Sequence, residues 1–162
     1  MENEFSKITK QLNEHKTVQG IMMFVNKQTI IKQHKKQEKN KATGVDGITK
    51  EDYEENLVSN VDDLITRMKK MAYKPKAVRR TYIPKTGSKE LRPLGIPAYE
   101  DKLVQGAMTD VLNAIYENIF LDCSYGFRPN RDCHQAIKKL DEIIMKKNIN
   151  YIVDADIKRI FQ

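Results

Sequence analysis

Two aspartates near the end of the chain are of the residue type that binds metal ions. Asp154 and Asp156 lie in the apolar segment 151–157, whose composition predicts a β-strand. Carboxylate oxygens are the ligands that Mg²⁺ prefers, and two-metal phosphoryl transfer needs several of them to converge. The pattern leaves two interpretations open: an ordinary pair of strand-end acids, or part of a metal site that the other residues of this chain do not complete.

Lysine and arginine side chains form a second group of candidates. Lys85 and Arg92 lie at the two ends of a short turn, where an ammonium and a planar guanidinium together can hold a triphosphate. Arg79 and Arg80 precede them at neighbouring positions, whose side chains point to opposite faces of a strand. The alternative is a basic turn that is simply exposed to solvent.

A third group of candidates lies in one loop. Phe127 next to Arg128 and Arg131 is suited to base stacking combined with phosphate contact on single-stranded nucleic acid. The other interpretation is structural, with Tyr125 and Phe127 anchored in the core and Asn130 capping the next helix. The residues leave both interpretations open.

The charge of the chain favours a polyanionic partner. The 162 residues carry 29 Lys and Arg against 22 Asp and Glu, a net charge of +7. Most of the excess lies in two segments, 67–92 and 32–41. Such clustering is typical of a nucleic-acid-binding surface, although a solvated basic face accounts for it as well.

Several classes of protein are not expected. The two cysteines, Cys123 and Cys133, are too few for a disulfide scaffold and lack the spacing of a C-x-x-C metal site. No apolar run approaches the roughly 20 residues of a membrane span, and the first residues do not resemble a signal peptide. The expected location is therefore the cytoplasm.

The elements that must position these candidates are mostly helical. Thr49 and Asp52 resemble a capping box that begins a helix, and apolar residues then follow a period of 3.6, with a break predicted near Asn60. In chain order the patterns predict one or two helices within 1–40, a loop over 40–47, a helix ending at 74–75, a β-hairpin from 78–84 and 91–96, a largely buried helix over 100–118, a loop over 124–130, an amphipathic helix over 133–144 and a strand over 151–157.

The order of the motifs resembles that of the group II intron-encoded reverse transcriptases, also called maturases. The motifs are Asn-Lys-Ala-Thr-Gly-Val-Asp-Gly-Ile-Thr at 40–49, Tyr-Lys-Pro at 73–75, Arg-Arg at 79–80, Ile-Pro-Lys at 83–85, Leu-Arg-Pro-Leu-Gly-Ile-Pro at 91–97, Asp-Lys at 101–102, Ser-Tyr-Gly-Phe-Arg-Pro-Asn-Arg at 124–131 and Val-Asp-Ala-Asp-Ile-Lys at 153–158. The resemblance covers residues 40–158, whereas residues 1–39 match only loosely.

The resemblance implies an α+β fold: the mostly helical fingers region of a right-hand polymerase fold, with the β-hairpin and the first palm strand. It divides the chain into a helical N-terminal extension (1–39), reverse transcriptase fingers (40–148) and a truncated start of the palm (149–162). The paired-aspartate palm motif, the thumb and the maturase domain are not found in the sequence. We therefore expect a fingers fragment that cannot polymerise on its own, although its parent is an RNA-directed DNA polymerase.

Roles for single residues follow from the same resemblance. Lys85 and Arg92 match the residues that contact the triphosphate of the incoming dNTP. Asp156 matches the first catalytic, metal-binding aspartate of the palm, with Mg²⁺ as the cofactor of the full-length parent, while Asp154 inherits no role. The implied RNA- or template-binding residues are Lys41, Thr43, Gly44, Arg79, Arg80, Arg128, Asn130 and Arg131.

The implied partners are intron RNA, template RNA, an RNA/DNA duplex and dNTP, and no membrane is among them. The apolar edges of the predicted strand add one expectation of their own, a homodimer that pairs through residues 149–157. Two alternatives stay open for the chain: a non-catalytic module that binds intron RNA to assist splicing, and a gene remnant.

Overall fold

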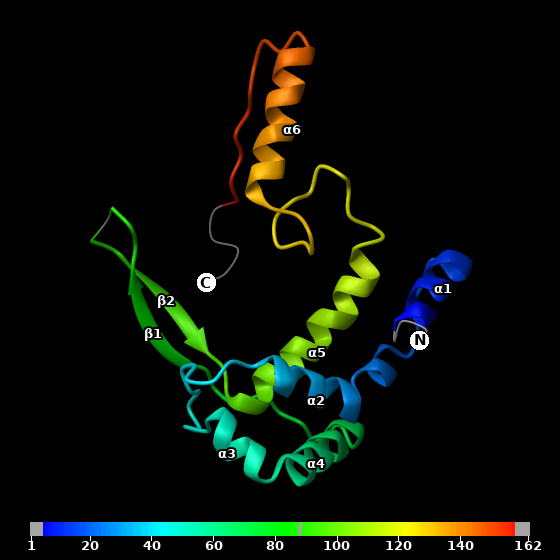
Figure 1. Ribbon diagram of the computed structural model, residues 1–162, viewed down its shortest axis with the longest axis vertical. Coiled ribbons are helices and arrows are strands. Elements are labelled where there is room, and N and C mark those ends of the chain that lie inside the picture. The colour runs from blue at the N-terminus through cyan, green and yellow to red at the C-terminus, as the bar shows by residue number, and fades with distance from the viewer. Residues whose placement is uncertain (1–4, 88, 158–162) are drawn as a thin grey trace. The chain divides into compact units, whose positions relative to one another are not determined.

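The computed structural model describes residues 5–87 and 89–157, which divide into two compact units, Met1–Asn118 and Ile119–Gln162. The elements of the first unit are α1 (Ser6–His15), the 3₁₀ turn η1 (Ile21–Phe24), α2 (Lys27–Lys36), α3 (Lys50–Glu55), α4 (Leu57–Lys69), β1 (Arg79–Pro84), β2 (Leu91–Ile96) and α5 (Tyr99–Tyr116), and the second unit contains α6 (Cys133–Lys146) (Figure 1). None of the described helices has the length and apolar character that crossing a bilayer requires.

Helix α5 forms the centre of the first unit. It packs against α1, η1 and α2, and its buried residues join those of α3 and α4 in one hydrophobic cluster. The N-terminal helices therefore share this core, and the predicted boundary at residues 39/40 stays a prediction. This helix is predicted to be largely buried over 100–118, but the buried residues of α5 end at Val111, and Leu112 is 40% exposed.

Local capping signals set where the helices begin. The capping box of Thr49 and Asp52 is confirmed: the Asp52 amide donates to Thr49 Oγ1 at 3.1 Å, and the Thr49 amide donates to Asp52 Oδ2 at 2.9 Å. The predicted break near Asn60 is wrong, since the break between α3 and α4 lies at Asn56. The Asn60 side chain instead donates from Nδ2 to the Tyr53 carbonyl at 3.1 Å, so it ties the two helices together without capping either.

Helix α4 ends earlier than predicted. Its last residue is Lys69, and Met71 adopts a left-handed φ of 54°. The amide of Ala72 then donates back to the Arg67 carbonyl at 2.9 Å, a closure typical of helix C-termini. This turn stops the helix before the Lys74-Pro75 pair is reached.

The predicted hairpin is confirmed. Strands β1 and β2 pair antiparallel, in a register that runs from Arg79 opposite Ile96 to Pro84 opposite Leu91. Most of its residues are exposed on both faces, which leaves the hairpin standing away from the helical core of its unit (Figure 1).

The second unit contains the predicted amphipathic helix, but another residue caps it. The Asp132 side chain accepts a hydrogen bond from the Gln135 amide at 2.8 Å, so Asp132 is the N-cap of α6. Asn130 lies outside the helix in a left-handed conformation with φ 59°. The prediction of an Asn130 cap is therefore wrong.

The strand predicted over residues 151–157 is not formed. A strand must pair its backbone groups with a neighbour, and the sheet found among the described residues consists of β1 and β2 alone. The segment lies exposed instead, with Tyr151 at 88% and Val153 at 87%. The α+β class is confirmed as a mixture of helices with a two-stranded antiparallel sheet, without the predicted first palm strand; residues 158–162 of the predicted palm start lie outside the described residues.

Candidate nucleotide and nucleic-acid interface

The hairpin register places the basic candidates on defined faces. Side chains alternate along β1, so Arg79 and Ile83 share one face and Arg80 lies on the other. Because Arg92 pairs with Ile83, its side chain lies on the face of Arg79. Lys85 follows the last paired residue of β1 and lines the same concavity as Arg92. We call the surface formed by Arg79, Ile83, Lys85 and Arg92 the basic face.

The cations of the basic face differ in their contacts. The Lys85 ammonium pairs with the Glu90 carboxylate, and this ion pair lowers the pKa of Glu90. The Lys85 amide also donates to the Glu90 carbonyl at 3.0 Å, which closes the turn. Arg92 has no ion pair or side-chain hydrogen bond with the residues that the structure describes. Since exposed ion pairs contribute little, a polyanion can displace Glu90 from Lys85 at small cost.

The loop 40–47 lies against the root of the hairpin. Arg79 Nε donates to the Thr43 carbonyl at 2.9 Å, and Lys102 Nζ donates to the Ala42 carbonyl at 2.6 Å. The structure thus brings two predicted template-binding residues, Thr43 and Arg79, together. It also gives Lys102, which belongs to the Asp-Lys motif but received no predicted role, a direct contact with this loop.

Gly44 lies close to the backbone that follows β2. A Cβ atom at this position would lie 2.5 Å from the Pro97 carbonyl oxygen and 2.5 Å from the Ala98 Cα. Both are backbone atoms immediately after β2, so a side chain has no room. Gly44 therefore allows the loop to lie close to the hairpin, and its predicted contact with RNA stays a prediction.

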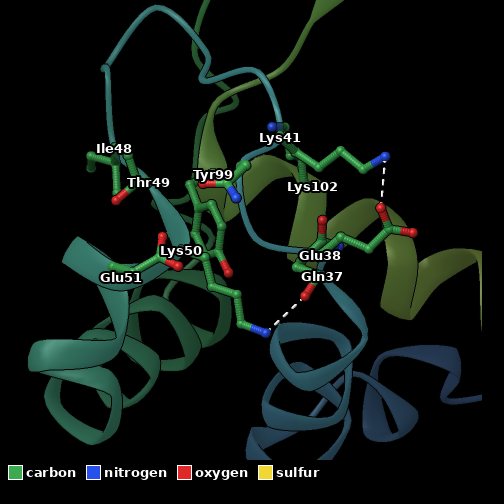
Figure 2. A pocket seen from close by; sticks show the side chains of 10 residues that line it. Gln37, Glu38, Lys41, Ile48, Thr49, Lys50, Glu51, Tyr99 and Lys102 are labelled. Carbon is green, nitrogen blue, oxygen red and sulfur yellow. Dashed lines mark hydrogen bonds and ion pairs between the residues drawn. The ribbon is translucent and has the colours of Figure 1, made fainter.

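A small cavity lies between this loop, α2 and α3. Figure 2 shows its lining residues, Gln37, Glu38, Asn40, Lys41, Ile48, Thr49, Lys50, Glu51, Tyr99 and Lys102. Lys50 donates to the Gln37 carbonyl at 2.7 Å, and Lys41 pairs with Glu38 at 2.8 Å (Figure 2). Its lysines thus already bind protein oxygens, so the cavity offers no ready anion site. Lys41, a predicted RNA-binding residue, lies at its edge.

The two arginines of the loop after α5 hold their own loop in place. Arg128 is 8% exposed, and its Nη1 donates to the carbonyls of Leu121 at 2.9 Å and Ser124 at 3.0 Å. Arg131 donates from Nη1 to the Asp122 carbonyl at 3.0 Å. Both guanidinium groups therefore have a structural role, and their predicted contact with RNA stays a prediction.

Phe127 is fully exposed at the tip of this loop. Its backbone adopts a left-handed φ of 57°. The interpretation of Phe127 as a core anchor is therefore wrong, while Tyr125, half-buried beneath the Arg131 guanidinium at 5.3 Å from the ring centroid, does help to hold the loop. Asn130 contributes its carbonyl, which accepts from Gln135 Nε2 at 3.3 Å.

Asp154 and Asp156 lie exposed in the extended segment after α6. No group of three or more His, Cys, Asp or Glu side chains suited to a metal ion occurs among the described residues. The described residues therefore do not form a donor set for Mg²⁺, and we assign no chemical step to such an ion.

His34 was not singled out by its sequence context, yet it is 2% exposed at the centre of an aromatic cluster. Its Nδ1 lies 2.9 Å from the Tyr99 hydroxyl, and its Nε2 lies 4.0 Å from a Glu54 carboxylate oxygen. Burial lowers the pKa of His34, an effect that Lys50 reinforces and Glu54 opposes. Tyr99 of this cluster also lines the small cavity beside the loop 40–47.

Comparison with known proteins finds relatives of the chain. The group II intron-encoded protein LtrA of Lactococcus lactis subsp. cremoris is 39% identical to it over 122 residues, which cover 75% of this chain and 20% of LtrA. The chain is related to the group II intron-encoded proteins. This relationship confirms the family resemblance of the motifs.

Further relatives match smaller shares of the chain. Protein YkfC of Escherichia coli K12 is 44% identical over 59% of the chain and 25% of YkfC. An uncharacterized 91 kDa protein in the cob intron of Schizosaccharomyces pombe is 37% identical over 62% of the chain and 12% of that protein. No family model matches the chain. The chain spans about a fifth of the length of LtrA.

Proposed function

We propose that the chain is the fingers region of a group II intron-type reverse transcriptase, which binds template RNA and the triphosphate of a dNTP. The observation that supports this best is the basic face: the hairpin register sets Arg92 opposite Ile83 and beside Lys85, with Arg79 on the same side. A guanidinium and an ammonium so placed are suited to the charge of a triphosphate.

RNA would lie along the loop 40–47 in this proposal. The loop contacts the hairpin through Thr43 and Arg79, so RNA bound on it would reach the edge of the basic face. The right-hand polymerase fold and the catalytic role of Asp156 belong to the proposed full-length parent. With Asp154 and Asp156 as its acidic pair, the chain alone should not support two-metal phosphoryl transfer.

Primer extension and ligand binding test this proposal together. We expect no DNA synthesis by the purified chain with RNA template, primer, dNTPs and Mg²⁺, but we expect binding of both single-stranded RNA and dNTP. Lys85→Ala should weaken dNTP binding about tenfold or more while RNA affinity stays within about twofold, because a charge-assisted contact contributes roughly 1.5–3 kcal/mol. DNA synthesis by the chain alone would contradict the proposal, and so would an equal loss of affinity for RNA and for dNTP in Lys85→Ala.

A second candidate function, binding of intron RNA without catalysis, is favoured by the lysines of α2 and the segment after it. Lys36 is paired with Asp110 at 3.1 Å and Lys41 with Glu38 at 2.8 Å, whereas Lys35 and Lys39 have no ion pair with any residue in the described part of the chain. Free surface ammonium groups are those that can neutralise phosphates.

Salt titration of RNA binding tests this second function. The double variant Lys35→Ala/Lys39→Ala should reduce the slope of log affinity against log salt by about 1.4 for single-stranded RNA, since each phosphate contact contributes about 0.7. Lys27→Ala/Lys36→Ala, which removes two ammonium groups already paired with Asp62 and Asp110, is the matched control and should reduce the slope less. An unchanged slope in the first variant would show that this surface does not contact RNA.

A further inference from the structure

The loop 42–46 is held against the hairpin root by cations from three separate segments, Lys76, Arg79 and Lys102. These contacts, together with the close fit of Gly44, attach the loop before β1, on β1, after β2 and on α5. We call this set of contacts the loop clamp. It joins the region proposed to bind RNA to the region proposed to bind triphosphate.

Lys76 holds two parts of the unit at once. Its backbone amide donates to Asp101 Oδ2 at 3.0 Å, and its ammonium donates to Asp46 Oδ2 at 3.3 Å. Asp101 is 4% exposed, and its other carboxylate oxygen accepts from the Tyr73 hydroxyl. The backbone of Lys76 is therefore fixed to the first turn of α5, while its side chain reaches the loop.

The Lys76 ammonium compensates the negative charge of the Asp46 carboxylate. Its side chain is 7% exposed, and Oδ1 has no hydrogen-bond partner among the described residues. Removing Lys76 would leave a buried charge without compensation, which is costly. The loop would be expected to open and expose Asp46 to water.

The hairpin has few other supports. Both of its faces are mainly exposed, so its orientation on the core of the first unit is set at the root, and Lys76 lies three residues before β1. Whatever orders the loop through Lys76 must therefore also order the start of the hairpin.

We propose that Lys76 is a positioning residue that couples RNA binding on the loop 42–46 to triphosphate binding on the basic face. This inference rests on the proposed function. Each ligand orders the loop clamp, so the second ligand loses less conformational entropy when it binds, and the coupling is positive. By linkage, RNA raises the affinity for triphosphate by the same factor as triphosphate raises the affinity for RNA.

Hydrogen exchange of the free chain tests the clamp without any ligand. Lys76→Met removes the ammonium but keeps much of the side-chain volume, and Asp46→Asn removes the opposite charge with almost no change of shape. In both variants the Gly47 amide, which donates to the Gly44 carbonyl, and the paired amides of residues 79–83 should exchange at least fivefold faster than in the unchanged chain. Lys74→Met, at an exposed position with no ion pair among the described residues, is the control and should change neither segment. Wild-type exchange in Lys76→Met would overturn the clamp.

Binding of a fluorescent dGTP analogue, with and without a saturating single-stranded RNA, tests the coupling. In the unchanged chain RNA should raise the affinity for the analogue about fivefold or more, the lower end of ordinary coupling. The ratio of the affinities with and without RNA should fall toward one in Lys76→Met and should keep its value in Lys74→Met.

The failures of the two proposals can be told apart. If the unchanged chain binds both ligands but RNA leaves its affinity for the analogue unchanged, the coupling is overturned and the proposed function stands. The same holds if RNA raises this affinity as much in Lys76→Met as in the unchanged chain. If the unchanged chain binds neither ligand, the proposed function and the coupling both fail.

Discussion

Gly44 occupies a position at which even a methyl group meets backbone atoms. We expect Gly44→Ala to lower the free energy of unfolding by about 1–3 kcal/mol, the usual cost of overpacking, because the Pro97 and Ala98 backbone would have to shift. Urea denaturation measures the change. Gly126→Ala is the control, since a Cβ there meets nothing within 4 Å and should change stability by less than about 0.5 kcal/mol. Equal effects of the two substitutions would contradict the close fit at Gly44.

His34 should make stability depend on pH. Burial lowers its pKa in the folded chain, while the unfolded chain keeps a value of about 6.5. As the pH falls below that value, the unfolded state takes up a proton that the folded state resists, so the free energy of unfolding decreases. The loss continues until the pH reaches the lowered pKa of the folded state.

Urea midpoints between pH 7.5 and 5.5 measure this dependence. The decrease should be smaller in His34→Asn, because that variant cannot titrate at this position. His15→Asn removes an exposed histidine and should leave the decrease unchanged. A pH dependence that is identical in the two variants would show that His34 does not cause it.

Asp132 decides where α6 begins. Its side chain accepts from the Gln135 amide, so Asp132→Ala should cost the helix about 1 kcal/mol. Asn130→Gly is the comparison, because glycine adopts the left-handed φ of 59° without strain and no cap is lost. Hydrogen exchange of the α6 amides should rise in the first variant and not in the second. The opposite order would restore Asn130 as the cap.

The elements that depend on local sequence were predicted correctly, and those that depend on distant partners were not. The Thr49 capping box and the two hairpin strands follow from residues within a few positions of each other. The strand over 151–157 fails because pairing needs a neighbour that no local pattern supplies. The shift from Asn130 to Asp132 is a smaller error of the same local rule, since both residue types are good caps.

The features of the candidate site were likewise predictable only where they depend on local sequence. Lys85 and Arg92 share one face of the hairpin, which follows from the alternation of side chains along a strand and from the length of the turn. The Lys76–Asp46 contact joins residues thirty positions apart, so no local pattern predicts it. The RNA contact predicted for Arg128 stays a prediction, while the bonds of its guanidinium to the Leu121 and Ser124 carbonyls arise from the closure of the loop, which no local pattern predicts.

The two units of the molecule differ in how much they bury. Helix α5 alone contains six buried residues, whereas within residues 119–157 Arg128 is the buried one. We therefore expect amides of α6 to exchange at least tenfold faster than those of α5, because few tertiary contacts oppose local opening. Hydrogen exchange at low protein concentration measures both helices in one experiment.

Equal protection of α6 would contradict that expectation and would show that its apolar side, including Ile137 and Leu140, is covered. Sedimentation then tests the homodimer expected from the sequence, which stays a prediction. Association that rises with concentration and is abolished by Val153→Lys would support it, and a monomer at all concentrations would exclude it.

The molecule as a whole is proposed to bind a triphosphate through one face of its hairpin, and two arginines of that hairpin test this directly. Arg92 lies on the basic face and Arg80 on the opposite face, so the two alanine variants remove the same charge from the same element. Titration with dNTP should show about tenfold weaker binding for Arg92→Ala, equivalent to about 1.4 kcal/mol, and a change of less than twofold for Arg80→Ala. Equal losses in the two variants would mean that the chain attracts nucleotides by net charge alone and would contradict the assignment of the site.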